Sequence, residues 1–448
     1  MNEAASRVLK SRLAGAIVAV GLAIVLYARA SDAYPFQVGI DFYQFWGVPV
    51  ANKMLGSSRT PYVDPAGYAD VLNGLSDASG SEKLHQANHH RRSLEPMGTP
   101  LLYATFQLAP ADYDRAHLAH TLLLFAAAGA VVFLLATLKG APVPAAICVA
   151  LAVLIVFNPF VQDVKYGNVT SLQLLFVVAL LWFAIGKHYP RNAALEGLLV
   201  GSLAAFVIFK PNTLWIALGL GIHFALARGA SRTLAHAAGA GVFTALALAV
   251  AALYFHDAGV WAQWLRFAQN SSGDLSLVRS LEQGNQSLAM LLTQRSQTYT
   301  LLQYSALITA ALALVFLSAM SSMGKRTDLV GATARRCFAD PWFAASAGIV
   351  FIFATSPLVW AYYHLFALVP IFWLFRREGG TALETSCALV SFAAMANPLL
   401  EFLGAHGFFG PLYSLLLLGW LPLLLGTLAY VVQQQRCAAV AASSPAVA

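Results

Sequence analysis

Residues 117–138 read HLAHTLLLFAAAGAVVFLLATL and contain no acidic residue, lysine or arginine. A helix needs roughly 20 apolar residues to cross the hydrocarbon core of a bilayer, so this run predicts a transmembrane helix. Comparable apolar runs follow one another along the chain, and we place about twelve of them by this criterion. They lie near residues 10–28, 117–138, 143–160, 170–186, 194–209, 213–228, 235–255, 300–320, 342–356, 362–375, 383–397 and 411–432.

The composition of the whole chain agrees with this pattern. Of the 448 residues, 59% are hydrophobic and only 10% are charged, whereas a soluble domain is about 25% charged. The 28 phenylalanines and 16 tyrosines also exclude a disordered chain. The predicted fold class is therefore an all-α polytopic membrane protein with a bundle of about twelve transmembrane helices.

Lysine and arginine predict the orientation in the membrane. The formal net charge is +7, yet no dense basic block suggests a nucleic acid partner. Most cations of the short loops fall on one side of the membrane, which the positive-inside rule assigns to the cytoplasm, and the short outer loops carry only Lys165 and Lys210. This predicts cytoplasmic N- and C-termini in a multi-pass protein, with these residues among the inside cations: Arg7, Lys139, Arg191, Arg228, Arg232, Arg335 and Arg376.

Two long outer loops take up most of the polar sequence of one predicted membrane domain, residues 1–436. The first loop covers 29–116 and the second covers 256–299. Within the first, FYQFWGVPVANKML and LLYATFQL are apolar but too short to span, so we expect interface helices there. The tail at 437–448 is predicted to be disordered. None of the four cysteines falls in an outer loop, so we predict no disulfide or metal framework.

Polar residues gather at the outer ends of the apolar runs. Asp41, in GIDFYQFW, fits a general base at a membrane-edge cavity, although a carboxylate at a helix start also fits an N-cap. Lys210, in KPN, fits a phosphate ligand or a side chain that reaches the headgroups. Asn168 lies in a loop whose glycine and asparagine also fit an ordinary turn.

Two later segments have a similar character. QGNQSL at 283–288, followed by Arg295, offers amide and hydroxyl groups for sugar hydroxyls or for a helix cap. SPLVWAYYH at 356–364 places His364 after three aromatic residues, a composition suited to stacking on a sugar beside a phosphate. A lone histidine in a membrane helix also fits a contact inside the bundle.

Metal-type spacings are weak. Asp112 and Asp114 have a D-x-D spacing, and His85, His89 and His90 lie at helical spacing. We interpret the former as solvated carboxylates and the latter as part of a polar loop. No nucleotide-binding P-loop, lipase-type G-x-S-x-G or H-E-x-x-H motif occurs.

Taken in order, these motifs resemble the bacterial polyprenyl-phosphate-dependent glycosyltransferases of the GT-C class, specifically glycosyltransferase family 87, which includes phosphatidylinositol-mannoside mannosyltransferases. The resemblance runs from about Tyr27 to His364. It rests on D-F-Y-x-x-W from Asp41, G-N-x-x-x-L-x-L-L from Gly167, K-P at Lys210, N-Q-S-L from Asn285 and S-P-x-x-W-x-x-x-H from Ser356.

The resemblance implies a GT-C-like bundle and inverting transfer of a sugar, mannose or another hexose or pentose, from a polyprenyl-phosphate donor to a lipid or glycan acceptor. It implies Asp41 as the general base and His364, Lys210 and Arg295 as ligands of the donor phosphate. The residues implied to bind sugar or acceptor are Tyr43, Trp46, Asn168, Asn285, Gln286, Trp360 and Tyr363.

The active site is expected on the extracytoplasmic face of the bacterial inner membrane. The sequence departs from the family where an acidic residue or second histidine often neighbours the histidine, since Ala361, Tyr362 and Tyr363 stand there. No acidic partner lies near Asp41, so we predict no metal site and no tightly bound cofactor. The alternative is a multi-span transporter or flippase of lipid-linked sugars, although no internal repeat supports it.

Overall fold

The computed structural model describes residues 3–33, 37–56, 60–90, 96–186, 190–273, 286–296, 301–321, 327–357, 359–396 and 418–443. The regular secondary structure in these ranges is helical, which confirms the predicted all-α class. A helix lies in each predicted apolar run. These helices are α1 Glu3–Ala33, α6 Tyr113–Leu138, α7 Val143–Val156, α9 Thr170–Gly186, α10 Ala193–Phe209, α11 Leu214–Arg228, α12 Ala230–Phe255, α15 Leu301–Ser321, α17 Pro341–Thr355, α18 Leu368–Leu374, α19 Ala382–Met395 and α22 Leu421–Ser443.

Helix length separates clear membrane spans from shorter apolar helices. Among the described residues, three helices are long and apolar enough to cross a bilayer: Tyr113–Leu138, Ala230–Phe255 and Leu302–Met320. A fourth span would combine α16 (Thr327–Ala339) with α17, which are bent by 99° at Asp340. By contrast, the 14 residues of α7 extend only about 21 Å, short of the roughly 30 Å hydrocarbon core. The chain is thus a membrane protein, and the count of about twelve spans stays a prediction.

The chain divides into two compact units. Unit 1 contains residues 1–178, 208–210 and 245–274, and unit 2 contains residues 179–207, 211–244 and 275–448. The single membrane domain over residues 1–436 stays a prediction.

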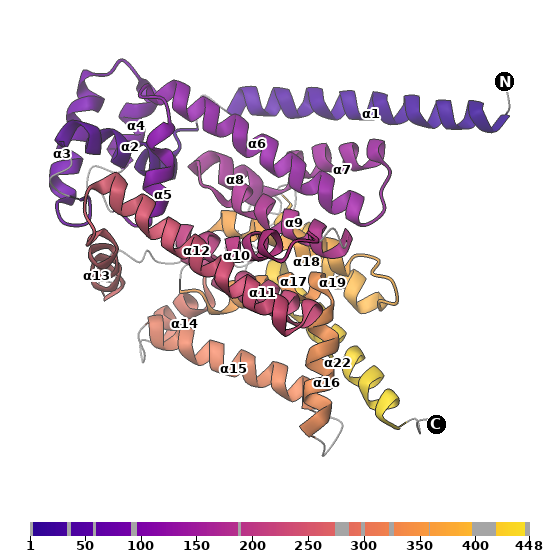
Figure 1. Cartoon of the computed structure of the whole chain (residues 1–448). Helices are drawn as coiled ribbons and strands as arrows, with labels where there is room; N and C mark the ends of the chain where they lie inside the picture. The colour runs from indigo at the N-terminus through magenta and orange to yellow at the C-terminus, as the bar shows by residue number, and fades with distance from the viewer. Residues whose placement is uncertain are drawn as a thin grey trace. The chain divides into compact units, whose positions relative to one another are not determined.

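Unit 1 is built around α2 (Ile40–Leu55), which is buried along most of its length. Its neighbours are α3 (Pro65–Ala78), α4 (Glu82–His90), α5 (Pro100–Thr105) and the 3₁₀ turn η2 (Phe106–Leu108) (Figure 1). Large aromatic side chains fill the core between them, including Phe42, Tyr43, Tyr68 and Tyr103. The two short apolar segments of the first predicted outer loop are therefore helical, as expected. Their predicted place in the membrane interface is not tested.

The rest of unit 1 adds longer helices to this aromatic core. Helix α1 packs against α7, and α7 packs against α6 (Figure 1). The short helix α8 (Asn158–Tyr166) contacts both α2 and α6, and α13 (Val260–Gly273) contacts α5. Helix α8 brings the turn at Gly167 and Asn168 close to the start of α2.

Unit 2 is a bundle centred on α17, every residue of which is buried or half-buried. Helix α11 packs along α17, and α15, α16, α18 and α22 also contact it. The short α14 (Leu288–Ser296) packs against α15 and α17. Such all-round burial explains why α17 is apolar on every face rather than on one stripe.

Helix α22 reaches further than the sequence predicted. It continues through Ser443, seven residues into the tail expected to be disordered from Cys437. The reason is local, because CAAVAAS is rich in alanine, which has the highest helix propensity.

Candidate functional site

Asp41 lies in the first turn of α2, at the edge of the unit 1 core. The N-cap of this helix is Gly39, with φ 65°, so the alternative interpretation of Asp41 as the N-cap is wrong. The side chain of Asp41 is half-buried. It accepts a hydrogen bond from Asn168 Nδ2 at 2.8 Å, which directs the carboxylate toward the turn between α8 and α9.

Two glycines allow this close approach. Gly39 and Gly167 both have a left-handed backbone, with φ 65° and 66°, a conformation that costs L-residues with a Cβ. A Cβ on Gly167 would lie 2.6 Å from the Cβ of Phe42, so a larger residue would push the turn away from α2. The glycine before Asn168 therefore helps to set the distance between Asn168 and Asp41.

Asn168 connects Asp41 to Lys210. Its side chain is 3% exposed. While its Nδ2 donates to Asp41, its Oδ1 accepts from Lys210 Nζ at 2.5 Å and from the backbone N of Val169 at 2.8 Å. One amide thus links a carboxylate and an ammonium from distant parts of the sequence, all three within unit 1.

Lys210 follows the last residue of α10 and is half-buried. Burial lowers the pKa of its ammonium to about 8, although the carboxylates of Asp41 and Asp163 oppose the shift by favouring the charged form. Lys210 is therefore mainly cationic at neutral pH and becomes neutral in the mildly alkaline range.

Asp163 is a member of this cluster that the sequence did not reveal. It is fully buried in α8 and accepts hydrogen bonds from the backbone N of Thr170, from the backbone N of Ser171 and from Ser171 Oγ, at 3.2, 2.9 and 2.5 Å. Burial raises its pKa, while the bonds from Ser171 oppose the shift. It caps the start of α9 from a position seven residues upstream. The sequence feature that could have identified Asp163 is its position as an acidic residue inside a short, otherwise semi-apolar loop.

His120 supports the same turn from α6. Its Nε2 lies 3.1 Å from the backbone oxygens of both Gly167 and Asn168. Since carbonyl oxygens only accept, we assign the proton to Nε2. The ring also stacks on Phe42 at 4.8 Å between centroids. His120 therefore positions Asn168, a role hidden in the sequence because the residue lies inside a long apolar run.

Tyr43 and Trp46, implied by the resemblance as sugar or acceptor ligands, lie in the core of unit 1. They are 1% and 2% exposed. Tyr43 donates to Asn88 Oδ1 at 2.6 Å, and Trp46 Nε1 donates to the backbone oxygen of Pro110 at 2.9 Å. In this structure both side chains hold α2 in place, and their ligand role stays a prediction.

In unit 2 the structure brings two predicted segments together. The backbone N of Gln286 donates to Val359 O at 2.6 Å, and Ser287 Oγ donates to Pro357 O at 3.0 Å. His364 follows in the 3₁₀ segment η5 (Ala361–Ala367), fully buried and stacked on Phe353 at 4.8 Å.

Several polar groups of unit 2 are buried without a hydrogen-bond partner in the described part of the chain. They include the side-chain oxygen of Gln286 and both amide atoms of Asn212. Trp360 is half-buried and Tyr363 is 6% exposed. Asn285 lies outside the described residues, as does the side chain of Arg295. Unsatisfied buried amides are costly, so these positions suit a hydroxyl-bearing ligand.

The acidic pair and the histidines considered for metal have other surroundings. Asp112 accepts from the backbone N of Arg115 at 2.8 Å as the N-cap of α6, and Asp114 accepts from Ser81 Oγ at 2.9 Å. His85 and His89 line a pocket of about 320 Å³. Among the described residues, no three potential ligands are grouped to hold a metal ion.

Comparison with known proteins identifies a family. A sequence model of glycosyltransferase family 87 matches residues 95–357, more than half of the chain. The matched region includes Asn168, Lys210 and Gln286, and it excludes Asp41 and His364. No curated protein and no solved structure matches the chain.

Proposed function

The chain belongs to glycosyltransferase family 87 and is a glycosyltransferase, and from this premise we propose that it transfers a sugar from a polyprenyl-phosphate donor to a lipid or glycan acceptor. The sugar is mannose or another hexose or pentose. Transfer takes place on the extracytoplasmic face of the inner membrane, because the predicted outer loops carry Asp41, Asn168 and Lys210.

Asp41 acts as the general base. Its carboxylate takes the proton of the acceptor hydroxyl as that oxygen attacks the anomeric carbon. The bond between this carbon and the phosphate oxygen breaks, and the lipid phosphate leaves with the electron pair. Attack opposite the leaving group inverts the anomeric centre, and neither an oxidant nor a reductant is needed.

Lys210 stabilises the leaving phosphate. Charge develops on the phosphate oxygens as the bond breaks, and a cation positioned beforehand in a partly dry site favours that state over the ground state. The shared contact of Asn168 with Asp41 and Lys210 carries the proposal, since it places a base and a cation on opposite ends of one amide.

Residues of unit 2 complete the assignment. We assign His364 and Arg295 to the donor phosphate, and Gln286, Asn285, Trp360 and Tyr363 to the sugar. The buried amide oxygen of Gln286 supports this assignment, because it lacks a partner among the described residues and fits a sugar hydroxyl.

The test uses purified protein in nanodiscs with polyprenyl-phosphate-mannose and a membrane lipid extract as acceptor. Asp41→Asn removes the base and keeps the shape, so we expect the turnover number to fall by about 10²–10⁴. Asp70→Asn is the matched control, since Asp70 is exposed on α3 in the same predicted loop. Equal turnover by wild type and Asp41→Asn would refute the assignment of the base.

A further inference from the structure

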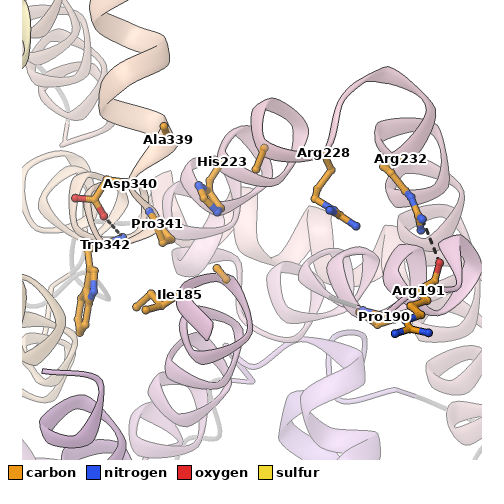
Figure 2. A pocket seen from close by; sticks show the side chains of 12 residues that line it. Ile185, Pro190, Arg191, His223, Arg228, Arg232, Ala339, Asp340, Pro341 and Trp342 are labelled. Atoms are coloured by element: carbon orange, nitrogen blue, oxygen red, sulfur yellow. Dashed lines mark hydrogen bonds between the residues drawn. The ribbon is translucent and has the colours of Figure 1, made fainter. Parts of the chain in front are cut away.

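Unit 2 contains a pocket of about 820 Å³ that the proposed transfer does not use. Figure 2 shows Arg191, Arg228 and Arg232 at one end, Asp340 and Trp342 at the other, and His223 between them. The residues come from the end of α9, from the segment just before α10, from α11 and α12, and from the bend between α16 and α17. The volume lies within the range of about 300–1,000 Å³ that small-molecule sites occupy.

The basic end is held in shape by a buried carboxylate. Glu196 is fully buried, and its two oxygens accept from Arg228 Nε and Nη2 at 2.9 and 2.8 Å. Arg232 Nη1 lies 3.2 Å from the same carboxylate, and His236 Nε2 lies 3.1 Å from it. Two guanidinium groups are therefore oriented before any ligand arrives.

A third arginine joins them through the backbone. Arg232 Nη2 donates to the carbonyl oxygen of Arg191 at 3.1 Å, while the side chain of Arg191 is exposed (Figure 2). Three guanidinium groups thus share one end of the pocket, and two of them contact the buried carboxylate of Glu196. At the other end the pocket is lined by Asp340, which accepts from Trp342 N at 2.9 Å and from Trp373 Nε1 at 3.2 Å, where it caps α17.

We propose that this end of the pocket is a second ligand site, which binds a phosphate group carried by a membrane lipid or by a small soluble molecule. A guanidinium group can donate two parallel hydrogen bonds to two oxygens of one phosphate. A cluster of oriented arginines therefore favours a phosphate group over a spherical anion. Ile185, Ala227 and Pro341 give the pocket apolar walls that suit the glycerol and first methylene groups of a lipid.

The predicted topology agrees with a lipid source. Arg191, Arg228 and Arg232 belong to the loops expected on the cytoplasmic side, where anionic lipids attract basic residues. The site is therefore expected on the opposite side of the membrane from the proposed transfer, and its occupation does not depend on Asp41 or on turnover.

The test measures binding to the full chain in detergent by calorimetry, with three probes. Dioctanoyl-phosphatidylglycerol has a phosphate and two acyl chains. Dioctanoylglycerol lacks the phosphate, and glycerol 3-phosphate lacks the acyl chains. We expect the phospholipid to bind and dioctanoylglycerol to give no saturable signal. Glycerol 3-phosphate that binds as tightly as the phospholipid identifies a soluble ligand, and binding of the phospholipid alone identifies a lipid headgroup.

Arg191→Gln is the decisive variant, because it removes an exposed side chain and leaves the contacts of Glu196 intact. We expect the dissociation constant for the binding probe to rise about tenfold. Arg232→Gln gives a second measurement, checked for folding by gel filtration. Arg336→Gln, at an exposed arginine of α16 outside the pocket, is the control and leaves the constant unchanged. Equal binding of dioctanoylglycerol and phosphatidylglycerol, or unchanged affinity in Arg191→Gln, would overturn the proposal.

Discussion

Two charged clusters in this protein are built in opposite ways. In unit 1, Asp41 and Lys210 each contact Asn168, at 2.8 and 2.5 Å, and the amide stands between the opposite charges. In unit 2, Glu196 meets Arg228 directly at 2.8 Å and lies 3.2 Å from Arg232. Asp41 is half-buried, whereas Glu196 is fully buried.

The difference indicates what each carboxylate is for. Both carboxylate oxygens of Glu196 accept hydrogen bonds from a neighbouring cation, which is typical of a structural ion pair. In unit 1 the carboxylate of Asp41 and the ammonium of Lys210 instead each bind one end of the Asn168 amide. The carboxylate and ammonium separated by Asn168 suit the proposed reaction, in which a substrate lies between the base and the cation. The direct contact of Glu196 with Arg228 suits a structural role, in which the carboxylate fixes the arginine for other ligands.

Loss of the cation in unit 1 is expected to have the largest effect. Lys210→Gln removes the charge that we propose stabilises the leaving phosphate, so we expect kcat to fall by about 10²–10³. Lys165→Gln is the control, because Lys165 is an exposed lysine of the neighbouring helix α8. Steady-state transfer assays in nanodiscs measure both. A fall of less than threefold in Lys210→Gln would place Lys210 outside the reaction.

Loss of a cation in unit 2 is expected to affect stability instead. Arg228→Gln removes the bidentate partner of a fully buried carboxylate. We expect the free energy of unfolding to fall by about 2 kcal/mol. This is less than the roughly 3–5 kcal/mol lost when a buried ion pair is fully broken, because Arg232 and His236 still face Glu196. Unfolding titrations with sodium dodecyl sulfate in mixed micelles measure it, with Arg336→Gln as reference. Equal stability of the two variants would contradict the structural role of this pair.

The pH dependence tests whether Lys210 must be charged. Its ammonium has a pKa of about 8, so the cation is present below this pH and is lost above it. We expect kcat/KM to fall tenfold for each pH unit above about 8 in the wild type. Lys210→Arg keeps its charge to much higher pH, so this alkaline limb should disappear in the variant. A limb that is the same in both proteins would assign the titration to another group.

The smallest effect is a displacement of that limb. Asn168→Asp converts the bridging amide into a carboxylate in direct contact with Lys210, which resembles the arrangement in unit 2. It also replaces the hydrogen bond to Asp41 with a contact between two carboxylates, so kcat is expected to fall as well, and the prediction concerns the position of the limb alone. The added negative charge favours the ammonium, so we expect the limb to move upward by about one pH unit. Asn192→Asp is the control, because Asn192 is exposed at the start of α10 and bonds to the backbone N of Ala194 there. Its limb should coincide with that of the wild type.

The sequence predicted the helices well, and the reason is physical. Apolar runs such as 117–138 lie inside helices because backbone groups in an apolar environment must bond within their own segment. Ends were less accurate, as α6 begins at Tyr113, where Asp112 provides the cap. Length and tilt depend on packing, so the number of true spans could not be read from apolar composition alone.

The site was predicted in parts rather than as a cluster. Asp41, Asn168 and Lys210 were recognised separately from their outer positions and from the resemblance, and the family is confirmed. The contact between these three residues depends on the left-handed backbone of Gly39 and Gly167 and on the side chain of His120. No local sequence pattern predicts these features. Glu196 was missed because averaging over the apolar run 194–209 hides one carboxylate. Asp163 was missed because its bonds to Thr170 and Ser171 form only when the turn folds.

The sequence also treated Arg228 and Arg232 only as markers of orientation. Their contact with Glu196 arises between α10, α11 and α12, elements brought together only by the fold. The positive-inside rule counts only the cations of the loops, so it does not detect that Glu196, inside a predicted span, is their partner.

The discontinuity of unit 1 has a consequence for biosynthesis. Lys210 belongs to unit 1 through a segment of three residues, 208–210, that returns after the first excursion into unit 2. The ribosome therefore delivers Asp41 and Asn168 before their cation, with α9 and α10 made in between. A nascent chain that ends before Lys210 contains the Asp41 carboxylate without its counter-charge, so the two groups can meet only after nearly half of the 448 residues have been made.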